Sequence, residues 1–111
     1  MAYDEELADR IRELLGDEPE VTEKRMFGGL AFLAAGHMAV AVSREGGLMV
    51  RVAPEATDTL LAEPHTRVFE MQGRPTAGWL RVDAEGVREL DDLAPWVWRG
   101  VGYARGLEPK G

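Results

Sequence analysis

The chain has 111 residues, of which 45% are hydrophobic and 30% charged, and its net charge at pH 7 is −7. This length predicts one domain over residues 1–111 with its own core, residues 108–111 forming a frayed tail. The absence of cysteine excludes disulfides and thiolate chemistry. Because no apolar run is long enough to cross a bilayer and no signal peptide begins the chain, we expect a cytoplasmic protein.

The acidic charge is confined to the N-terminal segment. Residues 1–23 hold nine acidic side chains against two arginines, whereas residues 24–111 hold eleven side chains of each sign. This distribution indicates a solvated acidic helix face on an otherwise neutral domain. The chain has no long basic run, so direct DNA binding is the least favoured function.

The first predicted element is a helix over residues 4–15. Leu7, Ile11, Leu14 and Leu15 recur at helical spacing, and the opposite face carries the charges. Acidic residues in the first turn suit the helix dipole, and Gly16 supplies the C-terminal stop.

The centre of the chain changes to the two-residue period of β-strands. Apolar residues alternate over residues 38–42 and again over residues 48–52, around the turn "REGG". Residues 30–33 predict a preceding strand and residues 23–27 a further one. The pattern indicates an antiparallel meander of three or four strands.

The rest of the chain predicts a helix, two strands and a helix. Pro54 begins a short helix that ends before Pro64. "RVFEM" and "GWLRV" then form strands separated by a loop "QGRPTA" over residues 72–77, and residues 91–107 have helical spacing. We therefore expect a two-layer α+β fold of order α-β(3-4)-α-β(2)-α, with five to six antiparallel strands and three helices.

The sequence offers no recognisable catalytic or metal-binding constellation. Ser43 is the one serine and has no nucleophile motif around it, and His37 and His65 lack metal-ligand spacing. The glycines of "RGVGYARG" are misspaced for a dinucleotide loop, and "MFGGL" lacks the lysine and hydroxyl of a phosphate loop. We expect no enzymatic activity, no cofactor and no metal.

Arginines next to apolar or aromatic residues are the main candidates for binding. The candidate interaction or anion-binding residues are Arg25, Arg51, Arg74, Trp79 and Arg81. A guanidinium can stack on an indole and can hold a carboxylate or phosphate through two hydrogen bonds. The alternative is that each arginine pairs with an acid of the same chain.

The stretch "KRMFGGLAFLAAGHM" contains a predicted structural corner at Phe27, Gly28 and Gly29. Because residues 30–33 read as a strand, the glycines are expected to let the chain turn or bulge between two strands. Phe27 is expected to be a core anchor beside this corner.

Several motifs occur together in one order: "RMFGGLAF", "GHM", "LMVRV", "GRPTAGWLRV" and "LAPWVWRGVGYARGL". Over residues 22–107 this combination resembles the N-terminal domain of the TfoX/Sxy family of bacterial proteins linked to regulation of natural competence. The resemblance implies a two-layer α+β fold similar to that of secretion chaperones, and regulation rather than catalysis. The full-length regulators carry a second, C-terminal domain, and we expect a stand-alone N-terminal domain here.

The leading hypothesis is thus a regulatory protein-interaction module that offers a sheet face or the glycine corner to a partner. The expected partner is another copy of the chain or a transcription regulator. The alternative is a small-molecule or anion-binding protein, or an uncharacterised enzyme, with Arg25, Arg51 and Arg74 around a pocket near Trp79.

Overall fold

The computed structural model describes residues 3–16, 18, 20–26, 28–71 and 73–107. The N-terminal helix α1 spans Glu5–Leu15, and four strands follow: β1 (Val21–Met26), β2 (Gly29–Ala34), β3 (His37–Val42) and β4 (Leu48–Arg51). A 3₁₀ turn η1 (Pro54–Ala56) leads into the short α2 (Thr57–Leu60), and strands β5 (Thr66–Met71) and β6 (Arg74–Val82) come next. A second 3₁₀ turn η2 (Ala84–Val87) and the helix α3 (Leu90–Arg105) complete the described chain. The predicted α+β class and element order are confirmed.

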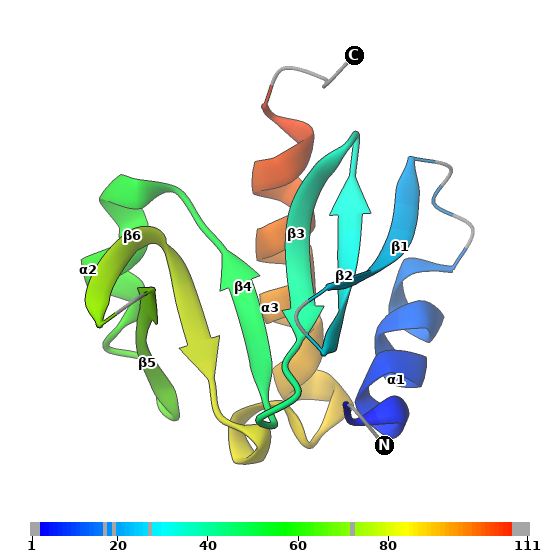
Figure 1. Ribbon diagram of the computed structural model, residues 1–111, viewed down its shortest axis with the longest axis horizontal. Helices are drawn as coiled ribbons and strands as arrows, with labels where there is room; N and C mark the ends of the chain where they lie inside the picture. The colour runs from blue at the N-terminus through cyan, green and yellow to red at the C-terminus, as the bar shows by residue number, and fades with distance from the viewer. Residues whose placement is uncertain (1–2, 17, 19, 27, 72, 108–111) are drawn as a thin grey trace.

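The strands form one antiparallel sheet in the order β1-β2-β3-β4-β6-β5 (Figure 1). The first four strands are neighbours in the sequence and in the sheet, as a meander requires. β6 then lies against β4, so the later strand occupies the inner position and β5 becomes an edge.

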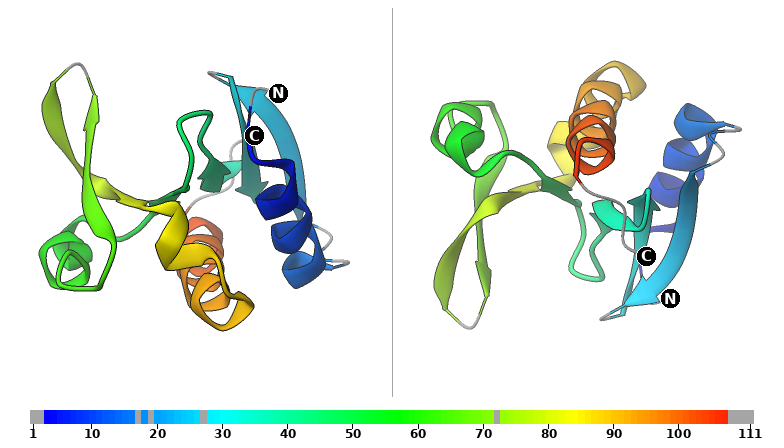
Figure 2. Two further views of the ribbon diagram at one scale, coloured as in Figure 1. Left: turned by 90° about the horizontal axis from the view of Figure 1, so that it is seen from below. Right: turned by 90° about the horizontal axis from the view of Figure 1, so that it is seen from above.

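The helices cover one face of the sheet and leave the other face open. Figure 2 shows α1 and α3 on the same side, while the β1–β2 and β5–β6 hairpins project toward the opposite side. We call this opposite side the open face. The resulting sheet is concave there, and this curvature creates the candidate site.

The core fills the space between the helices and the covered face of the sheet. Helical spacing brings Leu7, Ile11 and Leu15 of α1 into it, and alternation brings side chains of the central strands toward them. The largest fully buried side chain is Phe32 of β2. The other core members from the strands and α3 include Val40, Val50, Leu80, Leu93, Val97 and Val101.

The helix α1 begins and ends as its sequence predicts. The Asp4 carboxylate accepts a hydrogen bond from the Leu7 amide at 3.1 Å, and Gly16 ends the helix with φ of 51°. The Arg12 guanidinium donates two hydrogen bonds to the Glu23 carboxylate, at 2.7 and 2.9 Å, and this lowers the pKa of Glu23. The pair joins α1 to the edge strand β1.

The predicted loop over residues 72–77 is wrong for most of its length. β6 already begins at Arg74, and it pairs with β5 from the Met71–Arg74 position onward. Gly73 has φ of 79°, so a tight hairpin turn replaces the longer loop. The register then shifts between Glu70, which pairs with Pro75, and Val68, which pairs with Leu80. The turn η2 was not predicted either, although its Val87 is buried in the core.

The glycine corner is the hairpin turn between β1 and β2. Gly28 has φ of 78°, a conformation that favours glycine. Gly29 has a different requirement, because a Cβ there would lie 2.3 Å from the carbonyl oxygen of Val42. Phe27, the expected core anchor, lies outside the described residues.

A helix that spans a membrane must be both long and apolar. Among the residues that the structure describes, no helix combines the two properties.

Candidate functional site

The candidate site is a groove of about 980 Å³ on the open face of the sheet. Its lining includes Ala31, Ala41, Met49, Phe69, Trp79 and Arg81. These residues come from β2, β3, β4, β5 and β6, so the groove crosses most of the sheet. Ala31, Ala41 and Met49 of the lining do not belong to the core under α1 and α3, so the groove lies on the opposite face of the sheet.

The floor of the groove is apolar and includes two small side chains. Ala31 pairs in register with Ala41, and Ala41 pairs with Met49. Ala31 and Ala41 are buried but do not belong to the core between sheet and helices. Alternation explains this, because their neighbours Val40 and Val42 point to the covered face. Because Ala31 is only 1% and Ala41 8% exposed, the half-buried methionines Met26, Met38 and Met49 supply the accessible apolar surface here.

Aromatic side chains form one wall of the groove. The rings of Phe69 in β5 and Trp79 in β6 pack with their centroids 6.1 Å apart and their planes inclined at 47°. Tilted packing at this distance is a favourable aromatic geometry. The wall is therefore an ordered apolar surface at the side of the β5–β6 hairpin.

Arg81 is a deeply set cation in this groove. Its side chain is only 20% exposed, and its guanidinium lies 3.5 Å from the Glu45 carboxylate. Its hydrogen bonds to the Ser43 hydroxyl and the Gly46 carbonyl measure 3.5 and 3.3 Å. These contacts are longer than the roughly 2.7 to 2.9 Å typical of charge-assisted hydrogen bonds. These contacts hold Arg81 in place, but its guanidinium can still donate shorter hydrogen bonds to the carboxylate of a bound partner.

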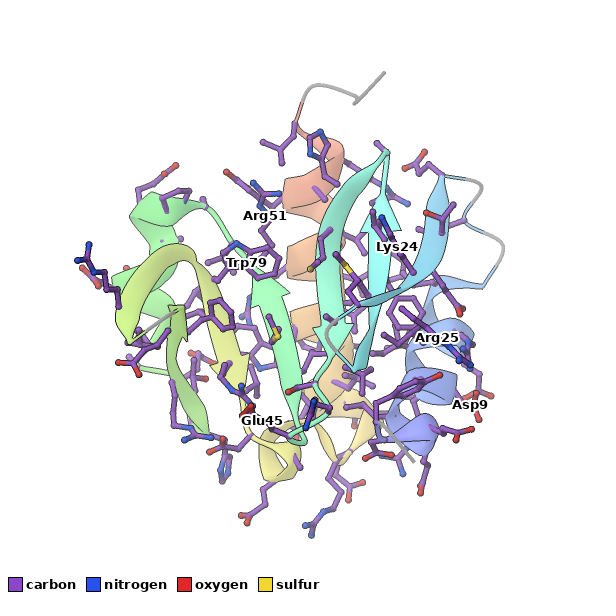
Figure 3. All side chains as sticks on the ribbon, viewed as in Figure 1. Asp9, Lys24, Arg25, Glu45, Arg51 and Trp79 are labelled. Carbon is purple, nitrogen blue, oxygen red and sulfur yellow. The ribbon has the colours of Figure 1, made fainter. Side chains whose placement is uncertain are left out.

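Arg51 lies at the end of β4, between two aromatic rings. Its guanidinium carbon is 5.7 Å from the ring centroid of Trp79 and 5.7 Å from that of Tyr103 in α3. Figure 3 shows Arg51 and Trp79 next to each other. Both are among the candidates predicted from the sequence, and the structure brings them together; Tyr103 was not predicted.

The other predicted arginines do not join Arg51. Arg25 pairs in register with Leu30, a core residue, so it lies on the helix side of β1, and Figure 3 shows it beside α1 and Asp9. Arg74 lies at the other end of β6 from Arg81, opposite Met71. A pocket enclosed by Arg25, Arg51 and Arg74 together is not what the structure shows.

Lys24 and Arg67 are basic residues on the open face that were not predicted, as is Arg44 in the groove lining. Lys24 pairs with Ala31 of the groove floor, and Arg67 pairs with Arg81. Arg67 also makes an ion pair of 2.6 Å with Asp83. The register of β1 against β2 distinguishes the two neighbouring basic residues. Lys24, and not Arg25, lies on the same face of the sheet as Ala31 and Ala41.

These features agree with a comparison against protein families. A family model described as the TfoX N-terminal domain matches residues 13–104. The chain belongs to the TfoX N-terminal domain family. Neither the curated proteins nor the solved structures compared with this chain gave a match.

The TfoX N-terminal domain match includes every strand of the sheet and almost all of α3. All groove-lining residues named above fall within it. The groove is therefore part of the TfoX N-terminal domain itself, and not of a segment added to it.

Proposed function

We propose that this TfoX N-terminal domain is a regulatory interaction module that binds a protein partner in the groove. The observation that carries the proposal is the half-buried apolar lining of the groove on the open face, formed by Met26, Met38, Met49, Phe69 and Trp79. An antiparallel sheet with one uncovered face usually presents polar side chains there. An apolar patch rimmed by charged residues is typical of an interaction site.

The composition of the groove favours a protein over a small molecule. Methionine side chains adapt to different partners, and Met26, Met38 and Met49 all line the groove. The aromatic pair Phe69 and Trp79 supplies the kind of side chain that is enriched at protein interfaces. Membership of a family linked to competence regulation supports a transcription regulator as the partner.

We expect Met49→Glu to weaken partner binding by about tenfold or more, equivalent to about 1.4 kcal/mol. The change would place a carboxylate on the apolar floor, where a bound partner would remove it from water without a matching donor. Partners captured from the source cells would be identified, purified and titrated against the parent and variant chains.

Leu90→Glu is the matched control for this titration. Leu90 is 48% exposed at the start of α3, so it undergoes the same apolar-to-acidic change outside the groove. We expect the control to bind as the parent does. Equal binding by the parent and Met49→Glu chains would show that the groove is not the docking surface.

Anion binding at Arg51 is the second candidate function. Trp79 and Tyr103 lie near the guanidinium, and no acidic residue of the described chain makes an ion pair with it. The hydrogen-bonding edge of Arg51 would then be available to a carboxylate or phosphate group.

A thermal-shift screen of small carboxylates and phosphates tests this candidate. A ligand at about 100 times its dissociation constant should raise the free energy of unfolding by about 2.7 kcal/mol in the parent. Arg51→Ala should show no such gain. The candidate is wrong if no anion stabilises the parent, or if parent and variant respond alike.

A further inference from the structure

The charge of the groove is opposite in sign to the charge of the N-terminal helix. Lys24, Arg67 and Arg81 lie in one register row across the open face, and Arg44 lines the groove near the β3–β4 turn. The acids that line the groove are Glu45 and Glu70. The domain therefore concentrates basic side chains on the open face, although the whole chain has a net charge of −7.

The basic residues lie on two sides of an apolar floor. Along one register row, the sheet presents Lys24, Ala31, Ala41, Met49, Arg81 and Arg67, in that order from β1 to β5. Four strand spacings separate Lys24 from Arg81, which is about 19 Å along the sheet at about 4.8 Å per spacing. An α-helix with its side chains is about 10 to 12 Å wide. A helix fits between the two basic sides, where the half-buried Met26, Met38 and Met49 offer it an apolar surface.

The existing contacts of these basic residues leave room for a partner's carboxylates. The contacts of Arg81 to Glu45, Ser43 and Gly46 are all 3.3 Å or longer. Arg67 is 64% exposed despite its ion pair with Asp83, and an exposed pair of this kind contributes little stability. A carboxylate bound in the groove would contact Arg81 in a place with little water. A charge-assisted hydrogen bond is stronger there than in bulk water.

Resting on the proposed function, we propose that the groove binds an acidic amphipathic helix of a partner protein. The helix would place its apolar face on Met26, Met38 and Met49. Carboxylates on one flank would face Lys24, and those on the other flank would face Arg81 and Arg67. On the opposite side of the same sheet, the amphipathic helix α1 already packs its apolar face against the strands, so this sheet accepts a helix on a face.

Other occupants fit the groove less well. Two copies joined groove to groove would bring two sets of basic side chains into one interface, at a cost from like-charge repulsion. Strand addition at the β1 edge is opposed by the exposed charges of Glu23, Lys24 and Arg25. A nucleic acid would meet Glu45, Glu70 and an apolar floor in place of a continuous basic track.

A synthetic helical peptide tests the proposal with the full chain. The probe carries leucines on one face and glutamates on both flanks, and its binding is followed by fluorescence anisotropy at low and at physiological salt. The comparison peptide replaces the glutamates with lysines, and a short DNA duplex serves as a third probe. We expect the acidic peptide to bind at least about tenfold more tightly than the basic peptide, and to weaken as salt rises.

Neighbouring residues of β1 supply a matched pair of variants. Lys24→Glu reverses a charge on the open face, whereas Arg25→Glu makes the same reversal on the helix side. We expect Lys24→Glu to weaken binding of the acidic peptide about three- to tenfold and Arg25→Glu to leave it unchanged. Arg81→Gln should also weaken it, and an unfolding curve checks that each variant is folded.

The outcomes separate this inference from the proposed function. If both peptides bind equally and Met49→Glu abolishes both, the groove is a docking surface but its preference for acidic helices is refuted. Equal effects of Lys24→Glu and Arg25→Glu, no peptide binding, or tighter binding of the DNA duplex would each overturn the inference. The titration with a native partner decides the proposed function independently.

Discussion

Replacing Phe32 with alanine is expected to lower the free energy of unfolding by about 3 to 5 kcal/mol. Phe32 is 1% exposed in the centre of β2, where it pairs in register with Val40. Its removal would leave a cavity in the core, because the sheet on one side and the helices on the other cannot fully close over it. A domain is typically stable by about 5 to 15 kcal/mol, so this one change would remove a large share.

Phe69→Ala is the comparison for this prediction, and urea unfolding of both variants measures it. Phe69 is half-buried in the groove wall and packs on Trp79, so its loss should cost about 1 kcal/mol. The two variants should also differ in function: Phe69→Ala is expected to weaken partner binding while it remains folded. If Phe32→Ala costs no more than Phe69→Ala, the core does not lie where the structure places it.

The local pattern of the sequence was enough to predict the elements that pair with their neighbours. Four apolar residues at helical spacing predicted α1, and its end at Gly16 is confirmed. Alternation around "REGG" predicted the β3–β4 hairpin, where Val40 pairs with Val50. In these cases, the residues that decide the structure lie within a few positions of one another.

The order of the last two strands could not be predicted in the same way. Local alternation says that β5 and β6 are strands, but it does not say which of them adds to β4. The same limit explains the wrong loop over residues 72–77. Gly73 and Pro75 are typical of loops, yet hairpin pairing with β5 continues past them.

The candidate site was predictable only where one strand contains the pattern. Trp79 and Arg81 share a strand face by alternation, and both line the groove. The choice between Lys24 and Arg25 depended on the register of β1 against β2, because charged side chains occupy both faces of this edge strand. The contact of Arg51 with Tyr103 joins β4 to α3, which is distant in the sequence. No pattern within either segment predicts that these two residues meet.

Gly100→Ala is expected to lower the free energy of unfolding by about 1 to 3 kcal/mol, although alanine is the better helix former. A Cβ at Gly100 would lie 2.4 Å from the carbonyl oxygen of Ala39 and 2.8 Å from Cγ1 of Val40. The backbone of β3 cannot yield as a flexible side chain would, so α3 would have to move away from the sheet. Urea unfolding of the parent and variant chains measures the loss.

Gly102→Ala provides the contrast in the same helix, since in the described part of the chain no atom beyond its chain neighbours and the backbone of α3 lies within 4 Å of a Cβ at that exposed position. This second change should stabilise the domain by about 0.5 to 1 kcal/mol. Because helix propensity acts equally in both variants, the difference between their free energies of unfolding isolates the packing of α3 on β3. Equal stability of the two variants would mean that the helix does not approach the strand this closely.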